Sequence, residues 1–278
     1  MQRINLMMMV LSLLCGFGVK AQDQKNDVLF CYGDFYPEQI KDYSIVVLEG
    51  IHFSKKDIEV LKQQNKTVLG YISLGEVNKD AAYYDSLKDF TLGKNEIWDS
   101  YILDLENEPT YDQLLDLFEE AMITKGLDGL FLDNVDNYGP YGPTPEKKPA
   151  LLKFLAEVNT TYPEMFLLQN AGVFIAEDTH QYVDAVAIES VATNYNFNTN
   201  NYRLRNKKEF EEQVNHLKEI EKNYNLPIIL IEYADTQRLR TKVLDRIKPF
   251  SWPYFIGQIE LQKIPKFHQS IVFIERNL

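Results

Sequence analysis

Eight short apolar runs recur along this chain, and segments with helical or loop character separate them. Glycine, proline or polar residues bound the runs, which is typical of strands that are buried on both faces of a parallel sheet. The runs occupy residues 28–32, 43–48, 67–73, 100–105, 127–132, 165–169, 183–188 and 226–231. Eight strands alternating with helices over about 250 residues predict an α/β chain that forms a single-domain (β/α)8 TIM barrel. An open, doubly wound sheet is the alternative, although no glycine-rich phosphate loop follows the first run.

Helix boundary signals fit the same alternation. Three segments begin with a capping residue followed three positions later by an acid or amide, namely Ser54 with Asp57, Thr110 with Gln113, and Asn206 with Glu209. Gly126 is expected to end the second of these helices, and residues 145–158 predict a fourth. The segment from residue 251 onward is less regular, and residues 271–274 are a candidate for an extra strand.

The N-terminal segment has the layout of a secretory signal peptide. A short positive start precedes an apolar run over residues 6–19, and small residues suited to cleavage end at Ala21. We therefore expect residues 1–21 to be removed and 22–278 to form the barrel domain with a short C-terminal extension, secreted or periplasmic. A lipoprotein anchor at Cys15 is the less favoured interpretation. The run is too short to span a bilayer, and no later run is long enough.

Net charge and the few cysteines and histidines limit the classes of molecule and metal that this chain is expected to bind. The chain carries a net charge of -12, and loss of Arg3 and Lys20 with the signal lowers it by two, to about -14. Such a chain should repel nucleic acid and attract cationic molecules. Cys31 would be the one remaining cysteine, and its apolar run predicts a buried, inert thiol. The four histidines are scattered, without zinc spacing, so we expect no metal and no cofactor, with a calcium or magnesium ion bound by carboxylates as the alternative.

Acids, amides and tyrosines follow nearly every run, where barrel enzymes place their chemistry. Turn capping would explain any one of them, but their number predicts an acidic pocket at one end of the barrel. The residues expected there are Tyr71, Ser73, Glu76, Asp104, Asp133, Asn134, Asp136, Asn170, Glu189, Glu232 and Tyr233. Two later loops add aromatic rings and amides suited to sugars, and we expect substrate contacts from Tyr138 and Tyr195.

This set of side chains favours glycoside hydrolysis. A serine hydrolase is disfavoured because there is no G-x-S-x-G motif and no histidine at a strand end. Glycoside hydrolysis needs one protonated and one ionised carboxyl group, and crowding of carboxylates raises the pKa of one of them.

Three motifs carry a resemblance to a known family. Residues 71–76 (YISLGE), 129–136 (GLFLDNVD) and 188–190 (IES) resemble the endo-α-1,4-polygalactosaminidase family, glycoside hydrolase family 114, and the related hydrolase domain that acts on the Pel exopolysaccharide of biofilms. The resemblance covers residues 28–258. It implies a barrel that cleaves α-1,4-linked galactosamine or N-acetylgalactosamine polymers. The essential acids of the family fall on Asp133 and Glu189, and Glu76, Asp104, Asp136 and Asn170 match surrounding pocket positions.

Together these observations predict a secreted, monomeric glycoside hydrolase whose partner is a cationic amino sugar polymer. We expect Glu189 to donate the proton and Asp133 to act as nucleophile or base. Two alternatives are a hydrolase of another glycan on the same barrel and a barrel that binds polysaccharide without cleaving it.

Overall fold

The computed structural model describes residues 28–265 of the chain. The expected signal segment 1–21, with Cys15 and Ala21, and the candidate strand 271–274 lie outside the described residues. None of the helices within residues 28–265 is long and apolar enough to cross a membrane.

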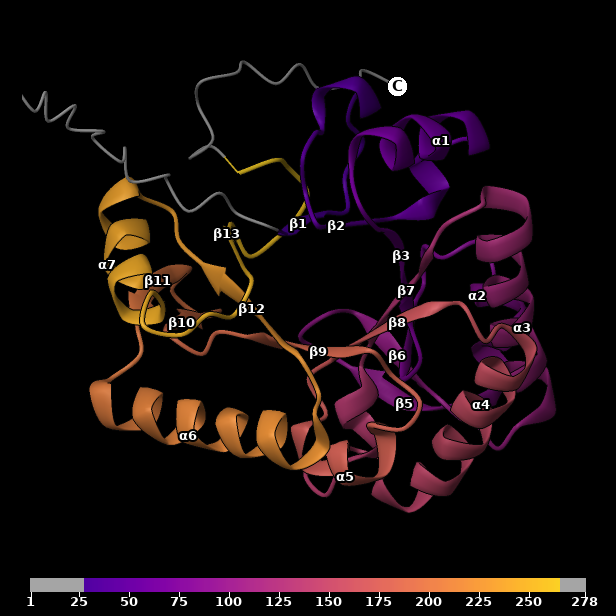
Figure 1. The fold of residues 1–278 in the computed structure, drawn as a ribbon. Helices are drawn as coiled ribbons and strands as arrows, with labels where there is room; N and C mark the ends of the chain where they lie inside the picture. The colour runs from indigo at the N-terminus through magenta and orange to yellow at the C-terminus, as the bar shows by residue number, and fades with distance from the viewer. Residues whose placement is uncertain (1–27, 266–278) are drawn as a thin grey trace, which may run out of the picture.

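Eight parallel strands form a nearly closed barrel (Figure 1). In barrel order they are β1 (Val28–Cys31), β2 (Ile45–Leu48), β3 (Val68–Ser73), β7 (Gly129–Asp133), β8 (Phe166–Asn170), β9 (Ala185–Glu189), β12 (Ile228–Tyr233) and β13 (Tyr254–Gly257). The last strand lies against the first, where the rings of Phe30 and Phe255 meet at 5.5 Å between centroids. The predicted α/β class and (β/α)8 fold are therefore confirmed.

Helices connect the strands and cover the outside of the barrel (Figure 1). They are α1 (Lys55–Gln64), α3 (Glu108–Glu119), α4 (Lys148–Thr161), α5 (Ala176–Thr179), α6 (Lys207–Tyr224) and α7 (Gln237–Ile247). A 3-10 turn, Pro37–Gln39, takes the place of the helix between β1 and β2. The short helix α2 (Tyr84–Leu87) belongs to the excursion between β3 and β7.

The expected helix caps are only partly correct. Ser54 and Asp57 form the predicted capping box of α1, and the side chain of Asn206 caps α6. The predicted capping box at Thr110 is wrong, because α3 already begins at Glu108 and Thr110 is buried inside its first turn. The helix then continues as a π-helical turn, Glu120–Lys125, and ends as expected at Gly126, whose φ of 74° suits glycine.

One expected barrel strand lies outside the barrel. The run 100–105 forms β6 (Ser100–Leu103), which pairs antiparallel with β4 (Glu76–Asn78) and β5 (Thr91–Asn95) in a separate three-stranded sheet. The eighth barrel strand is β13, in the C-terminal segment that the sequence left open. The physical reason is burial, since all four residues of β13 are buried whereas the middle of β6 is only half-buried. A second excursion, after β9, forms the hairpin β10 (Thr193–Asn196) and β11 (Asn201–Leu204).

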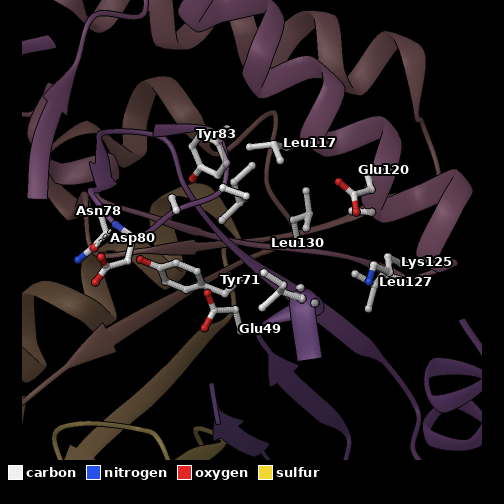
Figure 2. A pocket seen from close by; sticks show the side chains of 17 residues that line it. Glu49, Tyr71, Asn78, Asp80, Tyr83, Leu117, Glu120, Lys125, Leu127 and Leu130 are labelled. Carbon is white, nitrogen blue, oxygen red and sulfur yellow. Dashed lines mark hydrogen bonds between the residues drawn. The ribbon is translucent and has the colours of Figure 1, made fainter. Parts of the chain in front are cut away.

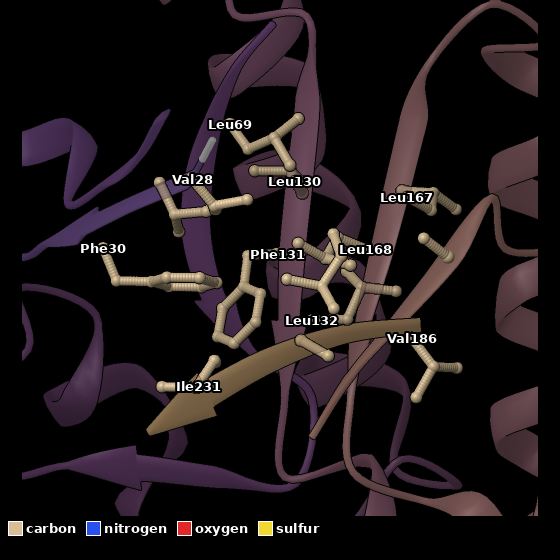
Figure 3. Close-up of a cluster of buried hydrophobic side chains, with 14 of the residues drawn as sticks. Val28, Phe30, Leu69, Leu130, Phe131, Leu132, Leu167, Leu168, Val186 and Ile231 are labelled. Carbon is tan, nitrogen blue, oxygen red and sulfur yellow. The ribbon is translucent and has the colours of Figure 1, made fainter. Parts of the chain in front are cut away.

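Large apolar side chains fill the barrel interior below its C-terminal end. Phe30 and Phe131 contact each other edge to face, with centroids 5.2 Å apart (Figure 3). Side chains alternate between the inner and outer faces along each strand, and partners in a parallel register share a face. Asp133 lies two residues after Phe131 and pairs with Ser73, and Glu189 pairs with Ile231. Asp133 and Glu189 therefore lie on the inner face, at the open end of the barrel.

Candidate active site

Two carboxylates at the C-terminal end of the barrel share one amide. Asn170 at the end of β8 donates one hydrogen bond to Asp133 Oδ1 (2.8 Å) and one to Glu189 Oε1 (2.9 Å) through the same nitrogen, Nδ2. Asp133 ends β7 and Glu189 ends β9, the two strands that flank β8. The sequence places the three side chains far apart, and the parallel register brings them into direct contact.

A tyrosine hydroxyl holds the outer oxygen of each carboxylate. Tyr71 from β3 donates to Asp133 Oδ2 at 2.8 Å, and Tyr233 from β12 donates to Glu189 Oε2 at 2.6 Å. The resulting chain of hydrogen bonds follows five adjacent barrel strands, from β3 through β7, β8 and β9 to β12. Rigid strands of the barrel therefore fix both carboxylates, which favours a preorganised catalytic site.

The three central residues of this chain of hydrogen bonds are the last residues of their strands, and the backbone turns away immediately after each of them. Asn134, Ala171 and Ser190 follow Asp133, Asn170 and Glu189, and their φ values are 56°, 54° and 58°. This left-handed region is disfavoured for residues other than glycine, and such residues gather at functional sites. The turn also adds a donor, since the backbone N–H of Asn134 lies 2.8 Å from Asp133 Oδ1.

The electrostatic environment raises the pKa of two acids at the barrel mouth, Glu189 and Asp136. Glu189 is exposed at the barrel mouth, yet the surrounding protein desolvates its carboxyl group and raises its pKa. The hydrogen bonds from Tyr233 and Asn170 oppose this shift, and the charges of Asp133 and Asp136 add to it. Burial, followed by the charge of Asp133, also raises the pKa of Asp136.

Tyr32 also belongs to this group and lies outside the set of side chains predicted from the sequence. Its ring lies 4.8 Å from that of Tyr71, and burial and the charges of Asp133 and Glu189 raise its pKa well above the usual value. An aromatic residue at the end of the first apolar run was the available signal.

Ser73 and Glu76 lie around the carboxylates and are engaged within the protein. Ser73 Oγ donates to Asn134 Oδ1 at 2.7 Å, which supports the turn after Asp133. Glu76 is buried, and it accepts hydrogen bonds from Asn95 (3.1 Å), Ser100 and Asn137 (3.3 Å). This glutamate therefore joins the three-stranded sheet to the segment that follows Asp133.

The structure does not bring Asp104, Tyr138 and Glu232 into the hydrogen-bond chain. Asp104 follows β6, outside the barrel, and pairs with Lys147 at 2.8 Å. Tyr138 is only 1% exposed and donates to the backbone of Leu74, so its ring offers no surface for a sugar. Glu232 points to the outer face of the barrel and is fully buried. Tyr195 lies on the hairpin β10–β11, where its ring packs 4.7 Å from Tyr202.

A cavity of about 410 Å³ lies on the outer face of the barrel wall, between β3, β7 and α3, and Tyr71, which bonds to Asp133, lies at one end of it (Figure 2). Mostly apolar residues line it, including Gly70, Ile72, Leu117, Leu127 and Leu130. Glu49 and Asp80 lie at one end beside Tyr71, and Glu120 and Lys125 lie at the other (Figure 2). Burial raises the pKa of Glu49, although nearby His52 opposes the shift. Across residues 28–265, no three His, Cys, Asp or Glu side chains are placed to share a metal ion.

Comparison with known proteins gives a family match and structural neighbours. A model of the glycoside-hydrolase family GH114 matches residues 20–252 of the chain. A curated relative, the uncharacterized protein MJ1477 of Methanocaldococcus jannaschii, is 22% identical over 228 residues. That alignment covers 75% of this chain and 64% of the relative, so the chain spans less than two thirds of the relative's length.

Two solved structures share the barrel. The glycoside hydrolase domain of PelA from Pseudomonas aeruginosa has a TM-score of 0.75 and 26% identity, and the match covers 85% of this chain and 96% of that one. Ega3 of Aspergillus fumigatus, solved as a complex with galactosamine, has a TM-score of 0.62 and 18% identity, and the match covers 84% and 90% of the two chains. The second likeness supports the fold alone.

Proposed function

The chain belongs to glycoside hydrolase family GH114, and from this membership and the geometry of the site we propose that it cleaves a polysaccharide of α-1,4-linked galactosamine or N-acetylgalactosamine units with Asp133 and Glu189 as the catalytic pair. The observation that carries the proposal is the amide of Asn170 that bridges the two carboxylates. Two carboxyl groups that face one reaction centre are the requirement of this chemistry.

The spacing of the pair supports a retaining mechanism. Oδ1 of Asp133 and Oε1 of Glu189 lie 2.8 and 2.9 Å from the same nitrogen, so they are separated by at most the sum of the two distances, about 5.7 Å. Retaining glycosidases place their carboxyl groups ~5–5.5 Å apart, whereas inverting enzymes leave ~6.5–9.5 Å for a water molecule. The bridge by one amide nitrogen therefore favours direct attack by a carboxylate on the sugar.

The hydrogen bonds support a different role for each carboxylate. Asp133 accepts three, from Tyr71, Asn170 and the backbone of Asn134, which hold its two oxygens in place and suit a nucleophile. Glu189 accepts two and its pKa is raised, which suits a proton donor. The hydroxyl of Tyr233 is able to accept a hydrogen bond from the protonated acid as well as to donate one to the carboxylate.

The reaction then has two steps. A carboxylate oxygen of Asp133 bonds to the anomeric carbon while the glycosidic C–O bond breaks, and Glu189 gives its proton to the departing oxygen. In the second step Glu189 takes a proton from water, and the water oxygen replaces Asp133 at the anomeric carbon. Asp133 leaves as a carboxylate and Glu189 is protonated again, so both groups return to their starting states.

Charge supports a cationic substrate. Asp136 lies close enough to raise the pKa of Glu189, and Glu49 and Asp80 lie at the end of the cavity beside Tyr71. Ammonium groups of galactosamine units would be attracted to these acids and to the net charge of -12. Ega3 was solved with galactosamine, which agrees with an amino sugar as the unit that is recognised.

We also propose that the protein acts outside the cytoplasm as a monomer. The support for the location is the signal-like composition of residues 1–21 and the polymeric nature of the proposed substrate. Cell fractionation with an antibody against the mature chain, together with light scattering of the purified protein, tests both points.

The test of the proposed function is release of reducing ends from partly de-N-acetylated α-1,4-galactosamine polymer. The wild type should release them, and Asp133→Asn and Glu189→Gln should not. Glu211→Gln, an exposed acid on α6, is the matched control and should retain full activity. Full activity in both site variants, with each shown to be folded, would contradict the assignment.

A further inference from the structure

We propose that Trp98 and Phe197 form a binding surface for the polysaccharide chain beyond the units at the scissile bond. This inference rests on the proposed function and names a second contact region for its substrate. The two rings come from separate hairpins, Trp98 from the turn between β5 and β6 and Phe197 from the turn between β10 and β11. Their centroids lie 5.2 Å apart at an interplanar angle of 86°, and we call this pair the aromatic bridge.

The topology places the aromatic bridge at the active-site end of the barrel. The β5–β6 hairpin belongs to the excursion that follows the C-terminal end of β3, and the β10–β11 hairpin follows the C-terminal end of β9. Strands β7 and β8 separate β3 from β9 in the barrel wall. Because the two rings touch, the excursions span the ends of β7 and β8, where Asp133 and Asn170 lie. A chain bound at the carboxylates therefore meets the aromatic bridge as it leaves the site.

Contacts on the first hairpin hold Trp98 in an exposed position. The buried Glu76 accepts from Asn95 and Ser100, which flank the turn on both sides. Lys94 pairs with Asp99 (2.8 Å) across the same turn. Trp98 nevertheless remains 53% exposed. A short turn that is fixed on both sides presents the indole without a large entropic cost on binding.

The second hairpin is fixed in a similar way. Glu232 accepts hydrogen bonds from the backbone and the hydroxyl of Thr193, the first residue of β10. The ring of Tyr195 packs 4.7 Å from Tyr202 and 4.9 Å from Phe197, so Phe197 is supported from behind and is still 48% exposed. Exposed, supported aromatic rings on neighbouring hairpins are typical of ligand-binding surfaces.

A sugar chain fits the aromatic bridge better than a protein does. The edge-to-face contact engages one ring face at most, which leaves other faces open to the positively polarised C–H groups of a pyranose and to ammonium groups. The hairpin also supplies the amides of Asn194, Asn196, Asn198, Asn200 and Asn201 for hydroxyl groups. A stable protein interface needs about 800 Å² on each partner, which two rings do not provide. Lys94 and Lys79 beside Trp98 are paired with acids, so they offer little to an anionic membrane.

The experiment compares long and short substrates. kcat/KM is measured for the polymer and for a short galactosamine oligosaccharide with the wild type, Trp98→Ala, Phe197→Ala and Trp98→Phe. Each alanine variant should lower kcat/KM for the polymer about tenfold and leave the short substrate unchanged, and Trp98→Phe should restore most of the loss. Ile123→Ala is the matched control, because Ile123 is an exposed apolar side chain (62%) in the π-helical turn that precedes β7, away from the C-terminal ends of the strands. Thermal melting checks that each variant is folded.

A binding measurement separates this inference from the proposed function. Glu189→Gln, alone and combined with Trp98→Ala, is sedimented with insoluble galactosamine polymer. Loss of sedimentation in the double variant supports the aromatic bridge whether or not the wild type cleaves the polymer. Equal sedimentation of Glu189→Gln with and without Trp98→Ala would overturn the proposed binding surface. So would an alanine variant whose kcat/KM falls equally for the polymer and for the short oligosaccharide. Retention by anionic lipid vesicles that depends on Trp98, without polymer binding, would overturn it in favour of a membrane contact.

Discussion

Two neighbouring strands end near a glutamate, and the surroundings of these glutamates differ in every respect that matters for chemistry. Glu189 on β9 faces the open end of the barrel, and side chains of Asn170 and Tyr233 hold its two oxygens. Glu232 on β12 faces the outer side, fully buried, and holds the backbone N–H groups of Ala192 and Thr193 at 2.7 and 2.9 Å. The first carboxyl group is available to a substrate, whereas the second fastens the β10–β11 hairpin to the barrel.

The comparison shows that an acid at a strand end is a poor guide to function unless its face is known. Ile231, not Glu232, pairs with Glu189 in the parallel register, so the two glutamates point to opposite faces. Activity should therefore depend on Glu189 and stability on Glu232, and the following variants are expected to separate these two effects.

The largest expected effect is on turnover. Glu189→Gln and Asp133→Asn should each lower kcat by at least about 10³-fold, since in the proposed mechanism each of these carboxyl groups exchanges a proton or a bond with the substrate. Their unfolding transitions in urea should remain close to that of the wild type. Turnover within tenfold of wild type in either variant would remove the distinction between the two glutamates.

Glu232→Ala should show the opposite behaviour. It leaves two buried N–H groups and the hydroxyl of Thr193 without their acceptor, which should lower the free energy of unfolding by about 3–5 kcal/mol. The kcat of the folded fraction should change little. Urea denaturation followed by tryptophan fluorescence measures the loss, and an unchanged midpoint would contradict the structural role.

The pH dependence of stability gives a second view of Glu232. Burial raises the pKa of this carboxyl group to about 7, and its hydrogen bonds reduce the shift only partly. Because the folded chain binds this proton more tightly than the unfolded chain, its stabilising contribution is fully present below the ordinary glutamate pKa. It is lost as pH rises through 7. As pH rises from 5 to 8, the unfolding free energy of the wild type should therefore decrease relative to that of Glu232→Gln, by about 3 kcal/mol at most. If the two unfolding free energies differed by the same amount at every pH, the raised pKa of Glu232 would be contradicted.

Tyr233→Phe should move the pH–rate profile of the site. The hydrogen bond from Tyr233 lowers the pKa of Glu189, so its removal should raise that pKa and extend activity to higher pH. Turnover at the optimum should fall about tenfold. Tyr71→Phe is the matched control, because Tyr71 bonds to Asp133 and the alkaline limb should stay in place. A shift of the same size in both variants would argue against Glu189 as the proton donor.

The smallest expected effect concerns the backbone at the two strand ends. Ser190 after Glu189 has a φ of 58°, whereas Ala234 after Tyr233 keeps a negative φ. Ser190→Gly should leave the free energy of unfolding unchanged or raise it by up to about 1 kcal/mol, and Ala234→Gly should lower it by a similar amount. Thermal unfolding of both variants measures this. Equal losses would mean that the left-handed turn after Glu189 carries no strain.

Much of the fold followed from periodicity, because seven of the eight predicted runs form barrel strands. The failure at β6 has a physical cause, since its apolar residues resemble those of a barrel strand while its burial comes from a separate sheet. β13 was missed because it lies in the less regular segment from residue 251 onward, where the alternation of apolar runs and helical segments ends. In both cases the decisive interaction is a long-range pairing that no local pattern records.

The candidate site was predictable in part for a related reason. Motifs indicated Asp133, Asn170 and Glu189, which the structure brings together through hydrogen bonds. The family resemblance singled out Glu189, but the apolar runs did not show that Glu232 faces outward, because runs that are apolar on both faces show no alternation. Trp98 escaped attention because it lies in an isolated turn whose meeting with Phe197 depends on the fold.

The most direct test of the central claim is the anomeric configuration of the first-formed product, followed by proton NMR during cleavage of the galactosamine polymer. The bridged pair of Asp133 and Glu189 predicts that the α configuration appears first and that the β form grows in only by mutarotation. Initial release of the β anomer would contradict the account, since it would require a water molecule between two carboxylates that one amide nitrogen holds together.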